Sequence, residues 1–326
     1  MPVIVNANEK HPFLPSLADP AAIERERAAH QDIRPLEIAI LNLMADKVTT
    51  ERQLAQWLGH TPIQVRLSFV ATDRYFQDIK NGRESKNTPP EHIRQFYKPW
   101  SEIKKQKFDG LIVTGVNARE PRVTDEVFWP DVQEILDWSH KNVFSSLFLC
   151  WGAKAALKHF HNIDSIKGTQ KTTGLFEHRL VDDKTGLLSD LPDRFPMPVS
   201  RWKNPDAAAV AACPELEIAA LSDETGPNVI VEAAPYDKTR FYPKHVYILG
   251  HPEYETETLG KEYWRDYEDD PASATLPLHY FPDNDPSQER TINNWRHTAY
   301  LYTNWVNAIY AATPRNRAHI PRPYTP

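Results

Sequence analysis

A cysteine stands between an apolar, strand-like stretch and a helix-forming one. The run 142–149 ends at Cys150, which is followed by the small-residue turn 151–153 and by the helix-forming segment 154–158. A strand-to-helix turn exposes its central side chain and directs the following backbone N–H groups at whatever that side chain attacks. We therefore predict that Cys150 is a nucleophile. Cys213 has no such setting, and we expect it to be inert.

A histidine and a glutamate follow a second apolar run far downstream. The run Val246–Gly250 ends in His251-Pro252-Glu253. A neutral imidazole can take the proton of a thiol or hold the thiolate in an ion pair, and a carboxylate can fix the tautomer of the ring. Cys150, His251 and Glu253 at strand ends are thus a candidate centre for covalent catalysis.

Composition and charge restrict the class of protein. The net charge is −6, and no basic cluster is interleaved with aromatic residues, so we expect no nucleic-acid partner. No apolar run approaches the roughly 20 residues that span a bilayer, and no signal peptide begins the sequence, so we expect a cytoplasmic protein without a membrane partner. Two cysteines are too few for a cysteine-based zinc site, and no histidine pair has the His-x-x-x-His spacing, so we expect no metal.

The elements around these residues alternate between strand-like and helix-like segments. Residues 131–138 have apolar positions at helical spacing. Seven apolar runs of strand length recur along the chain: 36–43, 64–70, 108–114, 143–149, 218–221, 229–233 and 246–249. Continuous apolar runs are typical of strands buried on both faces. This alternation predicts an α/β fold with a mainly parallel sheet flanked by helices.

The remaining segments are less regular. Thr88 and Glu91 have the spacing of a capping box at a helix start. Residues 191–198 and 266–286 are rich in proline, so we expect ordered excursions or loops there, and we expect 314–326 to be a tail. No internal repeat is visible.

Ordered sequence blocks along the chain resemble the homoserine O-acyltransferases, also called homoserine transsuccinylases. The resemblance extends from about residue 33 to about residue 310 and includes 34–44, 84–89, 107–115, Cys150-Trp151-Gly152-Ala153, 176–178, 250–254 and 280–286. It implies a class I glutamine amidotransferase-like, flavodoxin-like fold with irregular insertions. The expected layout is an N-terminal arm (1–32), one catalytic α/β domain (33–312) and a C-terminal tail (313–326).

The resemblance also implies a reaction. Cys150 would accept an acetyl or succinyl group from acyl-CoA, and His251 would then activate the hydroxyl of L-homoserine, giving ping-pong kinetics. The backbone N–H of Trp151 would stabilise the oxyanion, and Lys47 matches a family lysine near the acyl centre. The family suggests a homodimer that uses small-molecule substrates and no bound cofactor, with acyl-CoA as a co-substrate.

Three further positions match the acceptor site of the family. They are Lys171, Ser200 and Arg265. An amino-acid acceptor carries a carboxylate, and a guanidinium such as that of Arg265 can bind it through two parallel hydrogen bonds.

The chain departs from the family at Arg119. Family members tend to have glycine there when they use succinyl-CoA and glutamate when they use acetyl-CoA. The bulk of arginine favours acetyl, whereas its charge could pair with the free carboxylate of a succinyl group. The choice of donor stays open, and so does L-serine as the acceptor, because one methylene distinguishes substrates by only about 1–3 kcal/mol.

Two other classes of function remain as alternatives. A glutamine amidotransferase-like hydrolase would also use cysteine, histidine and glutamate, and glutaminase activity would reveal it. A non-catalytic binding protein could keep the same fold, and such a protein would tolerate loss of the Cys150 thiol.

Overall fold

The core of the fold is a group of parallel strands whose residues are almost all buried. The computed structural model describes residues 3–5, 22–29, 33–83, 87–118 and 120–323. Four of its strands are β3 (Leu36–Leu41), β4 (Val65–Ala71), β6 (Phe108–Val113) and β7 (Val143–Leu149). Every residue of β6 and β7 is buried, as expected for continuous apolar runs covered on both faces.

In the described part of the chain these strands belong to one 12-stranded sheet, with the order β2-β1-β4-β3-β6-β7-β12-β11-β10-β8-β9 and β5 beside β4. Neighbours are parallel from β2 (Ala22–Glu24) and β1 (Val3–Val5) across to β12 (Phe241–Ile248), and β5 (Tyr97–Pro99) also pairs in parallel. The predicted α/β fold with a mainly parallel, helix-flanked sheet is confirmed.

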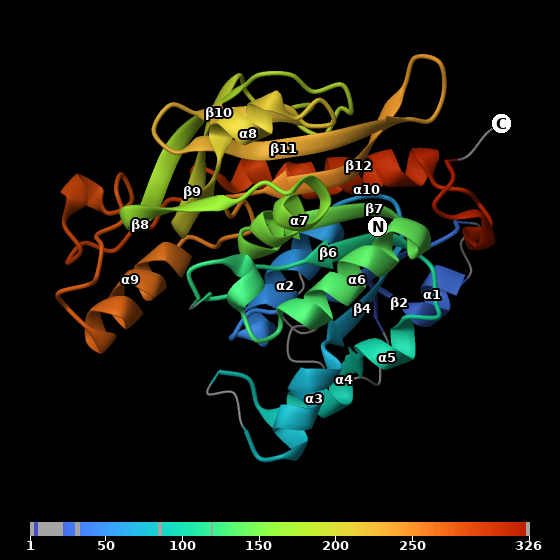
Figure 1. Cartoon of the computed structure of the whole chain (residues 1–326), viewed down its shortest axis with the longest axis horizontal. Coiled ribbons are helices and arrows are strands. Elements are labelled where there is room, and N and C mark those ends of the chain that lie inside the picture. Colours follow the sequence, from blue (N-terminus) through green and yellow to red (C-terminus); the bar gives the residue numbers. More distant parts are fainter. Residues whose placement is uncertain (1–2, 6–21, 30–32, 84–86, 119, 324–326) are drawn as a thin grey trace.

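Helices cover both faces of the sheet. Alternate strand residues point to opposite sides, and they belong to two different buried cores. On one face, α2 (Lys47–Leu58) and α10 (Tyr300–Ala312) pack with Leu36, Ile38 and Ile40. On the other face, α5 (Trp100–Ile103), α6 (Trp129–Asn142) and α7 (Trp151–His161) pack with Ala39 and Leu41. Figure 1 shows α6 and α7 in front of the sheet, with α10 running behind β12.

The second half of the sheet is antiparallel. It contains β8 (Ser165–Leu180), β9 (Arg194–Pro205), β10 (Glu217–Ser222) and β11 (Gly226–Pro235), and β11 pairs with β12. The prediction of a loop over 191–198 was wrong from Arg194 onward, because β9 begins there. Its prolines fit this place, since β9 is the last strand of the sheet and an edge strand tolerates residues without an N–H.

The shorter helices are α1 (Arg25–Ala29), α3 (Asp73–Lys80), α4 (Pro90–Phe96) and α8 (Ala207–Ala212). The predicted capping box at α4 was wrong. The hydroxyl of Thr88 instead accepts from the N–H of Lys47, 3.1 Å away, and donates to the carbonyl of Ala45, 2.8 Å away. Thr88 therefore ties the start of α4 to the start of α2.

Helix α9 (Thr258–Asp269) packs outside the two main cores. It lies below β8 and β9 at one side of the molecule in Figure 1. A small third core joins it to the segment around 280–295, with Leu175, Tyr254, Leu259, Tyr280, Phe281 and Trp295. None of the described helices has the length and apolar character needed to cross a membrane.

Candidate active site

Cys150 occupies a strained turn between β7 and α7. Its backbone has φ 47° and ψ −103°, a region that non-glycine residues rarely adopt. The N–H of Cys150 donates to the carbonyl of Ile248 across the sheet, at 2.7 Å. The side chain is buried, with 8% of the residue exposed. This is the geometry of the predicted nucleophile elbow.

Gly152, two residues after Cys150, is needed for this turn to pack against β6. A Cβ added to Gly152 would lie 2.6 Å from the carbonyl oxygen of Val113 and 2.9 Å from that of Thr114. Both contacts are with backbone atoms at the end of β6, which cannot move aside cheaply. Gly152 thus lets α7 begin directly against the carboxyl end of the neighbouring strand.

His251 lies near Cys150 because their strands are parallel neighbours. The register pairs Ile248 of β12 with Leu149 of β7, so the residues after both strands emerge at the same edge of the sheet. His251 Nδ1 lies 2.8 Å from Glu253 Oε1, and the hydroxyl of Tyr302 donates to Glu253 Oε2 at 3.0 Å. The ring of Tyr254 stacks on that of His251 at 4.2 Å. The predicted trio is therefore brought together and held from several elements.

The electrostatics of this trio favour a thiolate–imidazolium pair. Burial alone raises the pKa of the Cys150 thiol, but the charges of Lys154 and His251 and a hydrogen bond with His251 outweigh burial and lower this pKa to about 6. Burial alone lowers the pKa of His251, but the charges of Glu253 and Cys150 outweigh it and raise this pKa to about 10. At neutral pH the sulfur therefore carries the negative charge.

Two buried cations that the sequence analysis did not single out contribute to this environment. Lys154 lies one helical turn after Cys150 in α7 and is 5% exposed. Arg201 in β9 is 3% exposed, and its guanidinium donates to neutral oxygens of Asn204, Leu249 and Thr225. Because these partners carry no charge, the positive charge of Arg201 acts on Cys150, whose pKa it lowers. The position of Lys154, four residues after Cys150 in a predicted helix, could have indicated from the sequence that its charge lies near the thiol.

Trp151 is the first residue of α7, and its ring is buried against Phe128 with the centroids 5.1 Å apart. The first N–H groups of a helix have no acceptor within the helix. The backbone N–H of Trp151 thus stands at the helix N-terminus next to the thiol, where a developing oxyanion can be stabilised.

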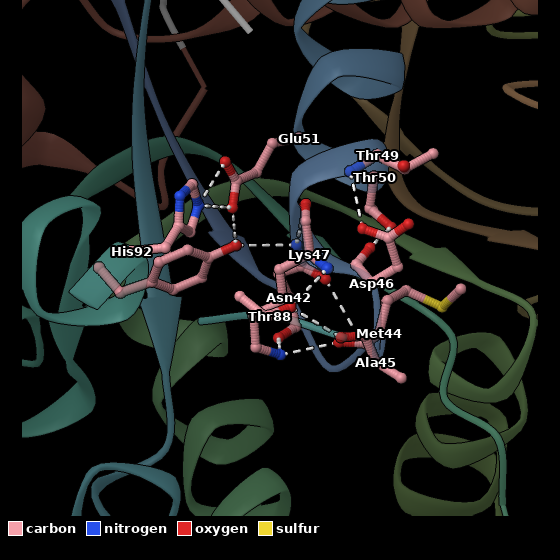
Figure 2. Close-up of polar contacts among 11 residues, drawn as sticks. Asn42, Met44, Ala45, Asp46, Lys47, Thr49, Thr50, Glu51, Thr88 and His92 are labelled. Atoms are coloured by element: carbon pink, nitrogen blue, oxygen red, sulfur yellow. Dashed lines mark hydrogen bonds and ion pairs between the residues drawn. The ribbon is translucent and has the colours of Figure 1, made fainter. Parts of the chain in front are cut away.

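Lys47 is buried rather than solvated. Figure 2 shows its ammonium against the turn that follows β3, where Nζ donates to the carbonyls of Asn42 at 2.7 Å and Met44 at 2.9 Å. Burial lowers the pKa of Lys47 to about 7, against the opposing charge of Glu51. This turn borders the nucleophile, because a Cβ on Gly115 would lie 3.7 Å from Met44 Sδ and 3.2 Å from Cys150 Cβ.

A polar network behind Lys47 escaped the sequence analysis. Glu51 is fully buried in α2 and accepts from the hydroxyl of Tyr97, and its carboxylate lies 2.9 Å from His92 Nε2 (Figure 2). Asn42 Nδ2 donates to the hydroxyl of Tyr97 at 2.9 Å. The network fixes the turn after β3 to α2 and α4, and no single residue type or spacing marks it in the sequence.

Of the three acceptor-site residues expected from the resemblance, Ser200 and Lys171 contact α9, and Arg265 belongs to it. Ser200 places its carbonyl oxygen 4.0 Å from Cys150 Sγ, and its hydroxyl donates to Glu262 Oε2 at 2.6 Å. Lys171 Nζ lies 2.7 Å from Asp266 Oδ2, and Arg265 Nη2 lies 2.7 Å from Asp266 Oδ1. Arg265 keeps an exposed guanidinium.

Glu262 is the residue of this region that the sequence analysis missed. Its second oxygen accepts from the hydroxyl of Tyr254 at 2.6 Å, and Tyr254 stacks on His251. The carboxylate of Glu262 therefore links Tyr254 to Ser200, which lies beside Cys150. Glu262 and Asp266 are four residues apart on α9, and this spacing on one helix face could have suggested an anionic site.

Arg119 lies outside the described residues. The backbone next to it is held, because the N–H of Glu120 donates to Glu126 Oε1 at 3.0 Å and the ammonium of Lys203 donates to the carbonyl of Glu120.

The fold and the site define an α/β enzyme with a strained cysteine beside a histidine–glutamate pair. The comparisons identify the family: the model of the homoserine O-succinyltransferase family matches residues 3–315. The chain belongs to this family and is an acyltransferase. The homoserine O-acetyltransferase of Ruegeria pomeroyi is 39% identical over 91% of this chain and 90% of its own length, and that of Thermotoga neapolitana is 39% identical over 89% and 90%. The family expected from the resemblance is confirmed.

Solved structures resemble the chain at low sequence identity. The crystal structure of SMU.1228c has a TM-score of 0.51 and 12% identity, covering 84% of this chain and 100% of that one. A glutamine amidotransferase of Thermotoga maritima has a TM-score of 0.46 and 13% identity, covering 86% and 97%. At such identities, the likeness to SMU.1228c concerns the fold alone.

Proposed function

We propose that this enzyme transfers an acetyl or succinyl group from acyl-CoA to the hydroxyl of L-homoserine, through a thioester on Cys150, in methionine biosynthesis. The observation that carries the proposal is the buried, strained thiol with a pKa of about 6 beside the His251–Glu253 pair. The acceptor is supported by the relatives, which are named homoserine O-acetyltransferases. Acyl-CoA is a co-substrate, and the reaction needs no bound cofactor.

In the first half-reaction the Cys150 thiolate attacks the carbonyl carbon of the thioester. The new C–S bond forms as the carbonyl oxygen becomes an oxyanion, which the N–H of Trp151 stabilises. The bond to the sulfur of CoA then breaks, and the His251 imidazolium gives its proton to the departing thiolate. One thioester replaces another, so this step requires little driving force.

In the second half-reaction the neutral imidazole of His251 takes the proton of the acceptor hydroxyl. The hydroxyl oxygen attacks the acyl-enzyme, and the Cys150 thiolate leaves as the O-acyl ester is released. Glu253 keeps the His251 ring in the tautomer and orientation that both halves need, and the hydroxyl of Tyr302 holds Glu253 in turn.

The acceptor binds where β8, β9 and α9 meet. An amino acid presents a carboxylate and an ammonium, and this region offers a group for each. The exposed guanidinium of Arg265 binds the carboxylate, with Lys171 close by through the shared Asp266. Glu262 binds the ammonium, since its carboxylate lies between Ser200 and Tyr254 beside the nucleophile.

The acyl group lies against the turn after β3, which Lys47 holds, and the family resemblance assigns the choice of donor to Arg119. The bulk of Arg119 favours an acetyl group, and its charge favours the free carboxylate of a succinyl group. Incubating the enzyme with either donor and measuring the intact mass decides between them. The expected adduct is one acyl group per chain, present in Cys213→Ala and absent in Cys150→Ala.

Adding an acceptor to the acyl-enzyme completes the test. L-Homoserine is expected to discharge the thioester faster than L-serine and to yield the O-acyl ester. An enzyme that forms no adduct with either donor, or that hydrolyses glutamine instead, contradicts the proposal. A higher kcat/KM for L-serine would replace the acceptor and leave the acyl-enzyme mechanism intact.

A further inference from the structure

The far end of α7 carries a second cluster of reactive side chains, outside the candidate active site. His161 is the last residue of α7, and Cys213 and Glu215 belong to the turn that follows α8. An 11-residue helix rises by about 16 Å, so this cluster lies a full helix length from Cys150. It borders a cleft of about 700 Å³ whose lining also includes Asp137, His140, His159 and Glu232.

Two of the three separations between donor atoms in this cluster are close to those of a tetrahedral metal site. His161 Nδ1 lies 3.6 Å from Cys213 Sγ, and Cys213 Sγ lies 3.2 Å from Glu215 Oε2. Zinc bonds of roughly 2.3 Å to sulfur and 2.0–2.1 Å to nitrogen or oxygen give tetrahedral edges of about 3.5 Å. All three donor atoms lie within 4.8 Å of one another. Glu215 is exposed, so rotation of its side chain can close the remaining distance.

The far side of the His161 ring is anchored in the way that metal-bound histidines are. Its Nε2 lies 3.0 Å from the hydroxyl of Tyr247 and 3.6 Å from Glu232 Oε2. When the hydroxyl oxygen of Tyr247 accepts from Nε2, the tautomer is fixed and Nδ1 is left free to bind a metal.

Cys213 does not resemble a second nucleophile. It follows the short helix α8 with ordinary backbone angles, whereas Cys150 occupies a strained turn between a strand and a helix. A thiol of this kind loses its proton when a metal binds, because the metal replaces the proton on sulfur.

We propose that His161, Cys213 and Glu215 bind one divalent transition-metal ion, with water as the fourth ligand. One sulfur, one imidazole nitrogen and one carboxylate oxygen in tetrahedral arrangement suit Zn²⁺ best. The ion ties the end of the α7 helix to the turn between α8 and β10. The site has one cysteine and one histidine, so neither a set of several cysteines nor the His-x-x-x-His spacing marks it in the sequence.

Cobalt titration of the metal-stripped full chain tests the proposal. We expect Co²⁺ to bind one per chain, with a thiolate-to-cobalt charge-transfer band and the visible bands of tetrahedral cobalt, and Zn²⁺ to displace it. The charge-transfer band is lost in Cys213→Ser, and the affinity falls more than about 10-fold in His161→Gln.

Two matched variants distinguish metal binding at this site from metal binding elsewhere on the protein. His159→Gln removes a neighbouring imidazole whose Nε2 pairs with Asp137, and Cys150→Ala removes the other thiol, so both are expected to keep the band. Circular dichroism of each variant verifies its fold. The proposal is overturned if the wild-type chain gives no stoichiometric band, if Cys213→Ser keeps it, or if Cys150→Ala abolishes it. Equal weakening in His159→Gln and His161→Gln also overturns it, since that result indicates loose binding to surface histidines.

Discussion

At the residue scale, the thiol of Cys150 is activated by charges from three elements. Lys154 comes from α7, Arg201 from β9 and His251 from the end of β12, and all three are buried. Charges in a buried site interact more strongly than in water, which is why they outweigh the cost of burying a thiolate. The reactivity of Cys150 is therefore a property of its surroundings and not of the cysteine alone.

Replacing Lys154 with glutamine tests this account. Lys154 lowers the pKa of the Cys150 thiol more than any other charge does, so its removal is expected to raise this pKa by about one unit or more. The rate of thiol alkylation as a function of pH measures the shift. Lys158→Gln is the control, because Lys158 lies one turn farther along α7 and pairs with Asp164. Equal profiles for wild type and Lys154→Gln would show that Lys154 does not activate the thiol.

The thiolate–imidazolium pair also predicts a pH profile for acylation. The rate of CoA release in a single turnover should rise as the pH increases through about 6, where the thiolate forms. It should fall as the pH increases through about 10, where His251 loses its proton. Without this proton, the ring can neither stabilise the Cys150 thiolate nor protonate the departing CoA thiolate. The two apparent pKa values describe the coupled Cys150–His251 pair and not either residue alone. A rate that keeps rising up to the ordinary pKa of a thiol, about 8.5, would mean that no such pair exists.

The sequence identifies some residues of the site and not others, for a physical reason. Cys150, His251 and Glu253 stand at the ends of apolar runs, so their place at a sheet edge can be inferred. Glu262 and Arg201 are ordinary charged residues whose partners are distant in the sequence, such as Ser200 for Glu262 and Leu249 for Arg201. Only the folded chain brings these partners within reach.

At the element scale, α7 must begin against β6 for the thiol to be presented. Gly152→Ala places a Cβ 2.6 Å from the carbonyl oxygen of Val113, so the helix start has to shift. We expect a loss of roughly 1–3 kcal/mol in the free energy of unfolding, as for other overpacked sites, together with a large loss of Cys150 acylation.

Gly260→Ala is the matched control for this prediction. Gly260 also lies near the start of a helix, but its nearest neighbour is the far end of the Tyr280 side chain at 3.1 Å. Alanine favours helix formation over glycine by up to about 1 kcal/mol, which offsets part of this contact, so this variant should lose much less stability than Gly152→Ala. Urea denaturation measures both, and equal stability of the two variants would contradict the packing argument.

Helix α9 carries a second prediction, because it presents Glu262 toward the nucleophile. Glu262→Gln keeps the size of the side chain and removes its charge. The KM for the amino-acid acceptor should rise by about 10-fold or more, as expected for the loss of a charge-assisted hydrogen bond, while the rate of acylation by acyl-CoA stays unchanged. Glu268→Gln, on the exposed face of α9, is the control. Slower acylation in Glu262→Gln would instead indicate that Glu262 supports the thiol.

The strands that the sequence predicts and those it misses differ in burial. β6 and β7 are buried throughout, and their continuous apolar runs are visible in the sequence. β8 has a run of exposed polar residues in its first half, and β9 contains Pro196, Pro198 and Pro205, so both resemble loops. These strands obtain their order from pairing with each other, which a local sequence pattern does not reveal.

At the scale of the whole molecule, Asp109 joins the segment before β3 and the C-terminal segment to the centre of the sheet. Its fully buried carboxylate at the start of β6 lies 3.0 Å from Arg34 Nη2 and 2.7 Å from Arg317 Nε, and it accepts from the hydroxyl of Thr313 at 2.8 Å. The segment expected to be a C-terminal tail is thus docked against the sheet at Arg317.

Replacing Asp109 with asparagine tests whether this junction stabilises the fold. The variant leaves two guanidinium groups without their carboxylate, so we expect a loss of about 2–4 kcal/mol in the free energy of unfolding at pH 7. Asp131→Asn is the control, because the pair of Asp131 with Arg74 is exposed and such pairs contribute about 0–1 kcal/mol. Comparable losses in the two variants would show that burial of the junction contributes nothing.

The pH dependence of this loss has a defined sign. Burial alone raises the pKa of Asp109, but the hydrogen bond and charge of Arg34 and the charge of Arg317 outweigh it and hold this pKa below its ordinary value. A carboxyl whose pKa is lowered by folding stabilises the native state fully above its unfolded pKa of about 3.9, and this stabilisation is lost as the pH falls through the native pKa. The difference in unfolding free energy between wild type and Asp109→Asn should therefore be constant near neutrality and shrink below about pH 4. A difference that grows on acidification would mean that the carboxyl is protonated in the native state, and the ion-pair account of the junction would be wrong.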